Sequence, residues 1–394
     1  MSINRSEIVI IGAGVMGNSI AYHLARQGHH VLVLERSEVA ISPAASWASA
    51  GGVRRQGRHP AEAPLASEAI SRWPTLEQEL EADLHYRQGG NLLLAESETE
   101  AAYLAGFVQH QQAMGFTDVR LIDRQQALKL APGLNDRVLA GSFSPADGQA
   151  DPPRTTRAFA QAAQRHGATY QENTPVLALL HQGEHITGVS TPQGEIQADL
   201  LILATGAWSN SLLQPLGLRL PMRPYALQML LSTPAPSKTL QPVLSAVGRH
   251  LSLKQRLDGS YLLGGGWLGN PAPNLSGYTL RPSSIEGNWQ AACELLPAVA
   301  QQRIARSWCG LEAESFDTIP FIGPAPGFSN LILAVGFSGH GFALSPAIGR
   351  AVADLINGKP VPELDNLSPA RILNFPVNEV EAFLTKTDEE NTLE

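Results

Sequence analysis

The sequence predicts an α/β fold with more than one domain, and two observations lead to it. Between residues 8 and 35 a β-branched run, a glycine-rich turn, a helical pattern and a second apolar run follow one another in the order of a βαβ unit. The chain also has 394 residues, which is more than one hydrophobic core usually serves, so two interlocked domains are expected.

Composition narrows the classes of function. Hydrophobic residues make up 43% and charged residues only 16%, which fits a large core, a bound cofactor or a subunit interface without choosing among them. The net charge of −8 argues against a nucleic-acid partner. Cys293 and Cys309 are too few for a disulfide framework or a cysteine metal site, so no metal is expected. Neither a signal peptide nor a transmembrane run stands out, so we expect a cytoplasmic protein with a solvated acidic tail at residues 386–394.

The first βαβ unit has the pieces of a dinucleotide site. A buried strand at 8–11 leads into Gly12-Ala13-Gly14-Val15-Met16-Gly17, then into a helix, and a second strand at 31–34 ends in Glu35. Gly12 permits the tight turn, Gly14 lets the backbone approach a pyrophosphate, and Gly17 lets the helix pack on the strand. The helix N-terminus attracts phosphate, and Glu35 can accept both ribose hydroxyls. NAD and FAD share this unit, so the fingerprint does not choose between them.

Two later segments favour a flavin. A buried strand at 199–203 ends in the turn Ala204-Thr205-Gly206, where the backbone can pass close to a cofactor. A strand at 331–335 runs into the glycines of residues 336–342, and a helix is predicted at 345–356. The N-terminus of such a helix can stabilise negative charge on a flavin as it is reduced.

Taken together, these motifs resemble the D-amino-acid-oxidase superfamily of FAD-dependent oxidoreductases. The chain is most similar to the sarcosine oxidase β-subunit group, which includes the β subunits of dye-linked L-proline, hydroxyproline and opine dehydrogenases. The resemblance rests on the glycines of 12–17 with Glu35 and on the segments 49–54, 145–152, 204–208, 318–323 and 336–342, in that order.

The resemblance implies a Rossmann-like FAD-binding domain that is discontinuous in sequence. We place it at residues 1–85, 146–212 and 306–370. Residues 86–145 and 213–305 then form a substrate-binding domain, a mostly antiparallel sheet that covers the flavin, and residues 371–394 form a C-terminal tail. The sequence is compatible with this, since 90–95, 226–231 and 259–264 look like strands, the last after an Asp258-Gly259 hairpin signal, and 154–166 and 283–296 look like helices.

The resemblance also implies an activity and a set of FAD contacts. The family moves a hydride from the carbon beside an amine to flavin N5, and the resulting imine is hydrolysed. The residues expected to bind the cofactor lie in the matching motifs and beside them: Gly12, Gly14, Val15, Met16, Gly17, Glu35, Arg36, Ser46, Ala50, Gly51, Gly52, Val176, Ala204, Thr205, Gly206, Trp208, Gly310, Gly336, Ser338, Gly339, His340, Gly341 and Phe342.

Five residues are candidates for the substrate side. Arg54 or Arg55 would clamp a substrate carboxylate, because guanidinium binds carboxylate in a bidentate manner; a solvent-exposed loop position is the competing reading for each. His340 would hydrogen-bond the flavin or polarise the site; a structural histidine that closes its turn is the competing reading. Tyr225 and Tyr261 are candidates to line the pocket, although packing is the commoner fate of such tyrosines.

Departures from the family's oxidases bear on the reaction. Monomeric sarcosine oxidases carry a lysine after Gly-Phe-Ser-Gly-His-Gly-Phe, where this chain has Ala343, and the strand around Leu262 lacks their oxygen-activating lysine. We therefore expect a dehydrogenase of proline, hydroxyproline, sarcosine or opine type, acting as the catalytic β subunit of a hetero-oligomer that passes electrons onward. The alternatives are a self-contained amino-acid oxidase of glycine, sarcosine or D-amino-acid type that makes hydrogen peroxide, and a flavin-binding scaffold subunit without turnover.

Two further cofactor questions follow from the same likeness. Cys309 lies where monomeric sarcosine oxidases attach FAD covalently, but non-covalent relatives share the sequence Trp-Cys-Gly-Leu, so non-covalent FAD is favoured. Some β subunits hold a second flavin, FMN, at a subunit interface. The histidine that attaches it near residues 152–154 is missing here, which leaves room only for a non-covalent FMN.

Overall fold

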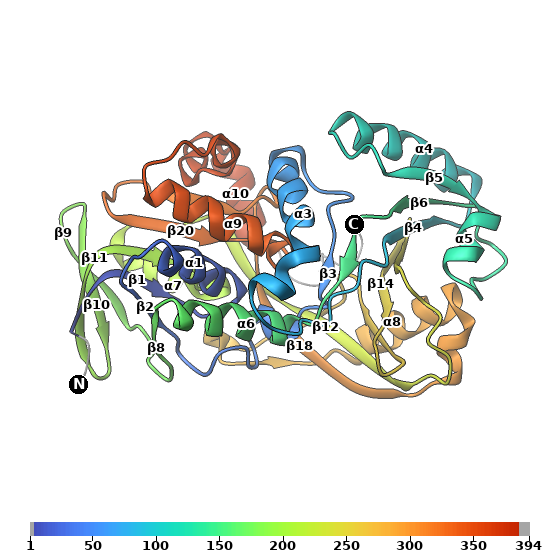
Figure 1. The fold of residues 1–394 in the computed structure, drawn as a ribbon, viewed down its shortest axis with the longest axis horizontal. Coiled ribbons are helices and arrows are strands. Elements are labelled where there is room, and N and C mark those ends of the chain that lie inside the picture. Colours follow the sequence, from blue (N-terminus) through green and yellow to red (C-terminus); the bar gives the residue numbers. More distant parts are fainter. Residues whose placement is uncertain (1–3, 386–394) are drawn as a thin grey trace.

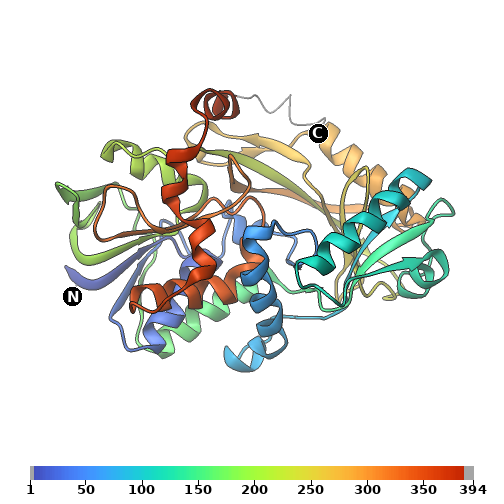
Figure 2. The ribbon, with the colours of Figure 1, turned by 90° about the horizontal axis from the view of Figure 1, so that it is seen from above.

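The computed structural model describes residues 4–385 and contains two large sheets that lie side by side along the long axis of the molecule (Figure 1). The first has eight strands and the second has ten. Figure 2, seen from above, shows helix α3 (Ala63–Glu79) standing between the two halves.

The first sheet is the dinucleotide-type sheet. Its central strands are β1 (Arg5–Ile11), β2 (Val31–Leu34), β11 (Gly194–Leu203) and β20 (Leu331–Val335), in the order β20-β11-β1-β2, and these neighbours run parallel. Strands β8 (Thr169–Gln171) and β19 (Phe321–Pro324) form its edges, while β9 (Ala178–Gln182) and β10 (His185–Thr191) extend β11. All residues of β2 and β20 are buried, as strands covered on both faces should be.

Three helices cover one face of this sheet. Helix α1 (Val15–Arg26) follows β1 and packs against both α6 (Pro152–Arg165) and α9 (Gly341–Ile356). Helices α1 and α9 both begin at glycine-containing turns that follow a central parallel strand. Their N-termini therefore come to the carboxyl edge of the sheet, where ligands of open α/β sheets bind.

The second sheet is mostly antiparallel. Its order is β17 (Tyr278–Thr279), β16 (Leu268–Pro271), β12 (Met222–Pro234), β15 (Ser260–Gly264), β14 (Arg249–Gln255), β13 (Val243–Ala246), β4 (Asn91–Ala95), β6 (Ala140–Ser144) and β5 (Arg120–Asp123). Strand β18 (Ile304–Ser315) pairs with β12, and within residues 4–385 β13 and β4 are the one parallel pair of strands in this sheet. Helices α4 (Glu98–Ala113), α5 (Arg124–Leu130) and α8 (Pro282–Leu295) pack on this half.

Short elements complete the chain. Strands β3 (Gly52–Val53) and β7 (Gly148–Gln149) form a small antiparallel ladder, and the one-turn helix α2 (Ala45–Ala48) precedes it. Helices α7 (Ser209–Leu213) and α10 (Val377–Thr385) lie after β11 and at the end of the described chain. Within residues 4–385 no helix is both long enough and apolar enough to cross a membrane.

The predicted α/β class and the second antiparallel sheet are confirmed, with three local differences. Helix α9 begins at Gly341 rather than at residue 345. Pro346 has no amide hydrogen to donate to the Phe342 carbonyl, but the Ser345 hydroxyl donates to it at 2.9 Å, so the helix continues through the proline. The late start was predicted because proline is common in the first turn of a helix.

The other two differences concern boundaries. Strand β18 joins the second sheet, although residues from 306 onward were assigned to the FAD-binding domain. Residues 377–385 of the predicted tail form α10, and the acidic stretch 386–394 lies outside the described residues. The domain limits themselves stay a prediction.

Candidate cofactor and substrate site

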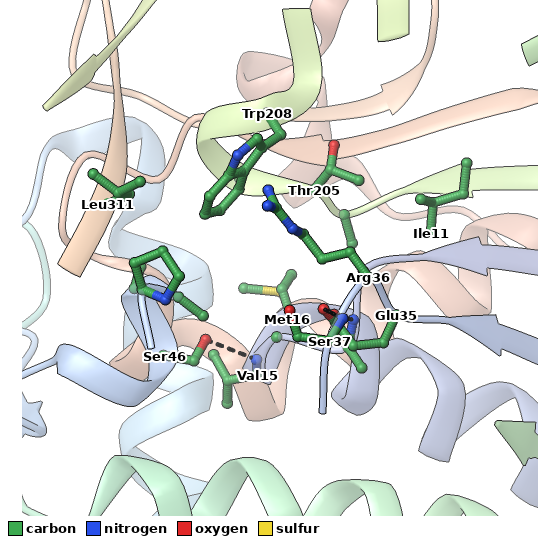
Figure 3. A pocket seen from close by; sticks show the side chains of 18 of the residues that line it. Ile11, Val15, Met16, Glu35, Arg36, Ser37, Ser46, Thr205, Trp208 and Leu311 are labelled. Atoms are coloured by element: carbon green, nitrogen blue, oxygen red, sulfur yellow. Dashed lines mark hydrogen bonds between the residues drawn. The ribbon is translucent and has the colours of Figure 1, made fainter. Parts of the chain in front are cut away.

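A cavity of about 440 Å³ extends along the carboxyl edge of the first sheet, from the end of β2 to the turn that precedes α9. Strand ends, the starts of α1 and α9, and the segment before α2 all contribute to its walls. Figure 3 shows part of this cavity, with Glu35, Arg36 and Trp208 from one part of the wall and Ser46 and Leu311 from another.

The turn between β1 and α1 depends on two glycines. Gly12 has φ +101°, a conformation that favours glycine, and a Cβ there would lie 2.6 Å from the Ala204 carbonyl oxygen. A Cβ on Gly17 would lie only 1.9 Å from the Gly12 carbonyl oxygen, so the helix can pack this closely on the turn only without a side chain. These contacts agree with the roles that the sequence predicts for both glycines.

Glu35 holds the other end of this unit. Its carboxylate accepts hydrogen bonds from the Ala13 amide at 2.8 Å and from the Ser37 amide at 3.1 Å. Across the cavity, the Ser46 hydroxyl accepts from the Val15 amide at 2.9 Å and closes the first turn of α1 (Figure 3). An acid fixed beside the phosphate-binding turn suits the ribose of an adenine dinucleotide.

Arg36 and Trp208 form the wall beside Glu35. The guanidinium carbon of Arg36 lies 4.8 Å from the centre of the Trp208 ring, and the indole Nε1 of Trp208 donates to the Leu275 carbonyl at 3.3 Å. Trp208 follows the turn Ala204-Thr205-Gly206, in which the Ala204 amide bonds to the Ile11 carbonyl and fixes the turn to β1. Both residues were predicted to bind the cofactor.

Strand β18 closes the opposite end of the cavity. The Leu311 amide donates to the Pro43 carbonyl at 2.9 Å, and a Cβ on Gly310 would lie 2.4 Å from the Cβ of Ala48. This contact joins the second sheet to the segment before α2 and brings Glu312 to the same wall as Gly339 and Gly341. The second sheet thus helps to enclose the cavity at the start of α9.

The residues present fit FAD. A strand–glycine–helix turn with a fixed acid suits the adenosine half, and a second helix N-terminus, that of α9, opens into the far end of the same elongated cavity. A mononucleotide would need only the first end. The fit therefore favours a dinucleotide. When the second half of this dinucleotide carries negative charge, the positive end of the α9 dipole would stabilise it.

Most of the predicted cofactor residues line this cavity: Gly12, Gly14, Val15, Met16, Glu35, Arg36, Ser46, Val176, Ala204, Thr205, Gly206, Trp208, Gly339, Gly341 and Phe342. The others lie behind the wall or beside it: Gly17, Ala50, Gly51, Gly52, Gly310, Gly336, Ser338 and His340. Gly17 and Gly310 act through close backbone packing, so their effect on the cofactor is indirect.

Several residues of the wall were not predicted from the sequence. Thr174 and Pro175 follow the edge strand β8, and residues 37–45 with Ser49 form the long connection on either side of α2. Neither segment carries a glycine fingerprint, so only their neighbours in the chain, Val176 and Ser46, were predicted. Glu312 was missed because alternating apolar and acidic residues on a strand usually indicate a solvated face.

A buried cluster of charged side chains lies beside the turn before α9. The Nδ1 of His340 is 3.2 Å from Glu62 Oε2, and burial, together with the charge of Arg58, lowers the pKa of His340 to about 4. Burial opposes ionisation of Glu62, but the hydrogen bond from His340 and the charge of Arg58 together outweigh it, so that the pKa of Glu62 is lowered. At neutral pH His340 is therefore a neutral imidazole that donates from Nδ1 to the Glu62 carboxylate and leaves Nε2 as an acceptor.

Two arginines belong to this cluster. Arg58 is 5% exposed, its Nε donates to the Arg54 carbonyl at 3.1 Å, and its Nη1 is buried without a hydrogen-bond partner among the described residues. Burial lowers the pKa of Arg58 to about 9 and also lowers the pKa of Arg54. Asp147, fully buried nearby, accepts from the Arg55 and Gln56 amides, and burial raises its pKa to about 6.

Arg54 and Arg55 are separated by the fold. Arg54 interacts with the charges of Asp147 and Glu62, whereas the Arg55 side chain pairs with Asp118 and lies 5.2 Å from the centre of the Phe116 ring. Arg55 is thus tied to the segment after α4 and away from the His340 cluster. Of the two residues that the sequence could not distinguish, Arg54 is the one beside the candidate site.

The two predicted tyrosines also have different surroundings. Tyr225 lies on β12 directly opposite Glu312 of β18, and its hydroxyl lies 3.9 Å from where a Gly339 Cβ would be, which places it at the far end of the cavity. Tyr261 is 3% exposed and belongs to the hydrophobic core of the second sheet. The expectation that Tyr261 lines the pocket does not match this position, because its ring packs in that core.

Cys309 is packed inside the second sheet, against β16. It is fully buried, and its sulfur would lie 2.5 Å from a Cβ on Gly269 of β16. Burial raises the pKa of its thiol to about 12, which disfavours the thiolate needed for covalent attachment. Its place in the sheet supports non-covalent FAD.

A second, smaller cavity of about 210 Å³ lies on the second sheet and reaches Ser49, which also borders the first. Lys254 of β14 stands directly opposite Leu262 and lines this cavity, and burial lowers its pKa to about 7. Strand β15, which contains Leu262, has no lysine of its own, as predicted. Lys254 comes from the neighbouring strand, a relation between strands that the sequence does not reveal.

The second cavity has a basic and aromatic wall that also includes Pro152 and Pro153. The guanidinium of Arg306 lies over Trp47 and Trp308, 5.2 and 5.1 Å from their ring centres. His85 also lines it, although no histidine is near residues 152–154 in the sequence. Whether this cavity takes FMN stays a prediction.

Comparison with known proteins identifies relatives over nearly the whole chain. It is 32% identical over 366 residues to glycine oxidase of Pseudomonas aeruginosa, covering 89% of this chain and 95% of that enzyme. It is 29% identical to the mitochondrial dimethylglycine dehydrogenase of Rattus norvegicus, of whose length it spans only 45%.

Solved structures agree with this. The crystal structure of L-proline dehydrogenase from P. horikoshii matches with a TM-score of 0.87 and 30% identity, covering 95% of this chain and 99% of that chain. Glycine oxidase from Geobacillus kaustophilus matches with a TM-score of 0.83, 26% identity and coverage of 93% and 99%. The family described as FAD dependent oxidoreductase (DAO) matches residues 7–355. The chain therefore belongs to the DAO family of FAD-dependent oxidoreductases.

Proposed function

We propose that this protein is an FAD-dependent dehydrogenase that oxidises the C–N bond of a secondary or imino amino acid of proline, hydroxyproline, sarcosine or opine type. The observation that carries the proposal is the pair of the half-buried Arg54 and the buried Arg58, beside the turn at which the cofactor cavity ends. The unpartnered Nη1 of Arg58 supports a missing anionic ligand, since buried N–H groups rarely lack a partner. A substrate carboxylate would supply it.

Bound FAD supplies the hydride acceptor, and the residues of the chain position the substrate. Arg54 and Arg58 would hold the carboxylate and so fix the carbon beside the amine. Glu62 orients the neutral ring of His340 through its Nδ1, which leaves Nε2 as an acceptor. Strands β12 and β18 pair beside this end and reduce its contact with solvent, which strengthens each of these contacts.

The similarity to L-proline dehydrogenase and to dimethylglycine dehydrogenase supports a dehydrogenase with a secondary or tertiary amine substrate. So does Ala343, which replaces the lysine that oxidases of the sarcosine type carry at this position. We infer that the chain belongs to the sarcosine oxidase β-subunit group and passes its electrons to partner subunits. A non-covalent FMN at such an interface is part of the same proposal.

A self-contained oxidase is the second candidate, and Lys254 is the observation that favours it. The strand around Leu262 carries no lysine of its own, which disfavours an oxidase, but Lys254 stands opposite this residue. The similarity to glycine oxidases points the same way. If the isolated chain forms peroxide and Lys254→Met does not, the protein is an oxidase. If air reoxidises the reduced flavin slowly, and equally slowly in Lys254→Met, the protein is a dehydrogenase.

An anaerobic flavin-bleaching screen tests the proposal. D- and L-amino acids, imino acids and N-alkyl amino acids are added to the holoenzyme, and bleaching is expected with members of the last two groups. Arg54→Met should raise KM at least about 30-fold, since losing a buried charged contact costs roughly 2 kcal/mol or more. Arg55→Met is the matched control and should leave KM unchanged, because Arg55 pairs with Asp118. Failure of every substrate to bleach the flavin would instead favour a scaffold subunit.

A further inference from the structure

Glu312 is an acidic residue in the wall of the cofactor cavity, at the end formed by the turn before α9. It lies on β18, and its neighbour across the ladder is Tyr225 of β12. Both side chains therefore project from the same face of the second sheet. The cavity wall at this end also includes Gly339 and Gly341, which carry no side chains. Glu312 is thus the acidic side chain at the end where the substrate of our proposed function would bind.

The Glu312 carboxylate has no cationic partner among residues 4–385. A backbone hydrogen bond from the Ala313 amide is the one contact that stabilises its charge, and burial raises the pKa of Glu312 to about 7. Glu314, two residues along the same strand, differs sharply. Its Oε2 lies 2.7 Å from Nε of Arg223, and no ion pair of this kind relieves Glu312.

Enclosed carboxylates of this kind are costly unless something pairs with them. The described part of the chain provides no such partner, so the half-buried Glu312 either takes up a proton or pairs with a cation that a ligand brings into the cavity. We infer that Glu312 binds the positively charged amine nitrogen of the substrate, and that it makes the site selective for zwitterionic amino acids over uncharged or purely anionic analogues.

This inference rests on the proposed function and extends it to the other end of the substrate. Arg54 and Arg58 supply positive charge for the carboxylate, and Glu312 supplies negative charge for the amine. Hydroxy acids and simple carboxylic acids satisfy the first contact but not the second. Such a site rejects an analogue strongly, because a buried charge is left unpaired when the analogue lacks the matching group.

Two inert probes of nearly the same shape test the inference with the holoenzyme. Trimethylglycine has a permanent positive charge, and 3,3-dimethylbutyrate has carbon in place of its nitrogen. Neither is a hydride donor of the proposed kind, and binding is followed by the shift of the flavin absorption spectrum and by calorimetry. Wild type should bind trimethylglycine at least about 30-fold more tightly, in line with a buried charge pair worth roughly 2 kcal/mol or more.

The variant Glu312→Gln should lose this preference while it keeps FAD and binds 3,3-dimethylbutyrate as before. Glu314→Gln is the matched control and should keep the preference, because Glu314 pairs with Arg223 outside the cavity. In wild type the affinity for trimethylglycine should rise as the pH rises through about 7, where Glu312 becomes ionised, and this rise should vanish in Glu312→Gln.

The outcomes separate this inference from the proposed function. Bleaching by imino or N-alkyl amino acids tests the function, whereas the inert probes test Glu312 even if no substrate is found. Equal binding of both probes by wild type, no binding of the charged one, or an unchanged preference in Glu312→Gln would each overturn the inference.

Discussion

Replacing Gly17 by alanine adds one methyl group at the closest contact of the nucleotide-binding turn. The new Cβ would lie 1.9 Å from the Gly12 carbonyl oxygen, and ordinary contact begins at 3.4 Å, so about 1.5 Å of separation must be gained. The opposing atom belongs to the backbone of a turn that is itself fixed, since Gly12 donates to the Leu34 carbonyl. No flexible side chain can move aside.

Two opposing energies decide the outcome. Alanine in place of glycine within a helix gains about 1 kcal/mol from helix propensity. Overpacking of this kind costs typically about 1–3 kcal/mol, and a backbone contact lies at the upper end. We therefore expect a net loss of about 1–2 kcal/mol in the free energy of unfolding. Because α1 must move away from the turn, its first amides also move, and FAD should bind about 10- to 100-fold more weakly.

The assays are urea unfolding of the apoprotein and titration of apoprotein with FAD by fluorescence quenching. Gly106→Ala in α4 is the control, since nothing lies within 4 Å of the added Cβ. It should leave FAD affinity unchanged and add up to about 1 kcal/mol of stability. If Gly17→Ala bound FAD within about threefold of wild type and unfolded at the same urea concentration, the close packing described here would be wrong.

Three further predictions concern other parts of the molecule. Arg350 of α9 bonds Glu68, Asp354 and Glu363, so Arg350→Met should cost about 2 kcal/mol in urea unfolding, whereas Arg5→Met, which breaks an exposed pair with Asp199, should cost less than about 0.5 kcal/mol. Burial lowers the pKa of His23 to about 3, so below pH 6.5 the unfolded chain binds a proton that the folded chain does not. Stability should therefore fall on acidification between pH 6.5 and 4, and His23→Gln should reduce the slope by up to about 1.4 kcal/mol per pH unit. Denaturation should release all FAD, because burial keeps the Cys309 thiol protonated, and mass spectrometry that finds flavin on Cys309 would refute non-covalent binding.

The nucleotide end of the site was predictable because its signals are local in sequence. Gly12, Gly17 and Glu35 lie within one βαβ unit, and each has a physical role that hardly depends on the rest of the fold. Helix α9 was found for the same reason, although its start was placed four residues late. The Ser345 hydroxyl replaces the bond that Pro346 cannot make, and this compensation is visible only in the structure.

The substrate end was harder because its residues come together through tertiary contacts. Arg54 and Arg55 are equivalent in sequence, and the distant Asp118 separates them by holding Arg55. Arg58 and Glu62 were not predicted at all, since they carry no motif, yet they complete the cluster around His340. Lys254 reaches Leu262 only through the pairing of β14 with β15.

Glu312 and Glu314 show most clearly what the fold adds to the sequence. In the run Leu311–Ser315 apolar or small residues alternate with acids, and such a pattern normally indicates one buried and one solvated face. The alternation is correct, since Leu311 and Ala313 are buried. However, the bond between Leu311 and Pro43 brings the acidic face of β18 against the cofactor domain at Glu312, while Glu314 meets Arg223 beyond the cavity. Two acids with the same local pattern thus acquire opposite electrostatic surroundings. This contrast is why exchanging each for glutamine can distinguish a ligand-binding charge from a structural one.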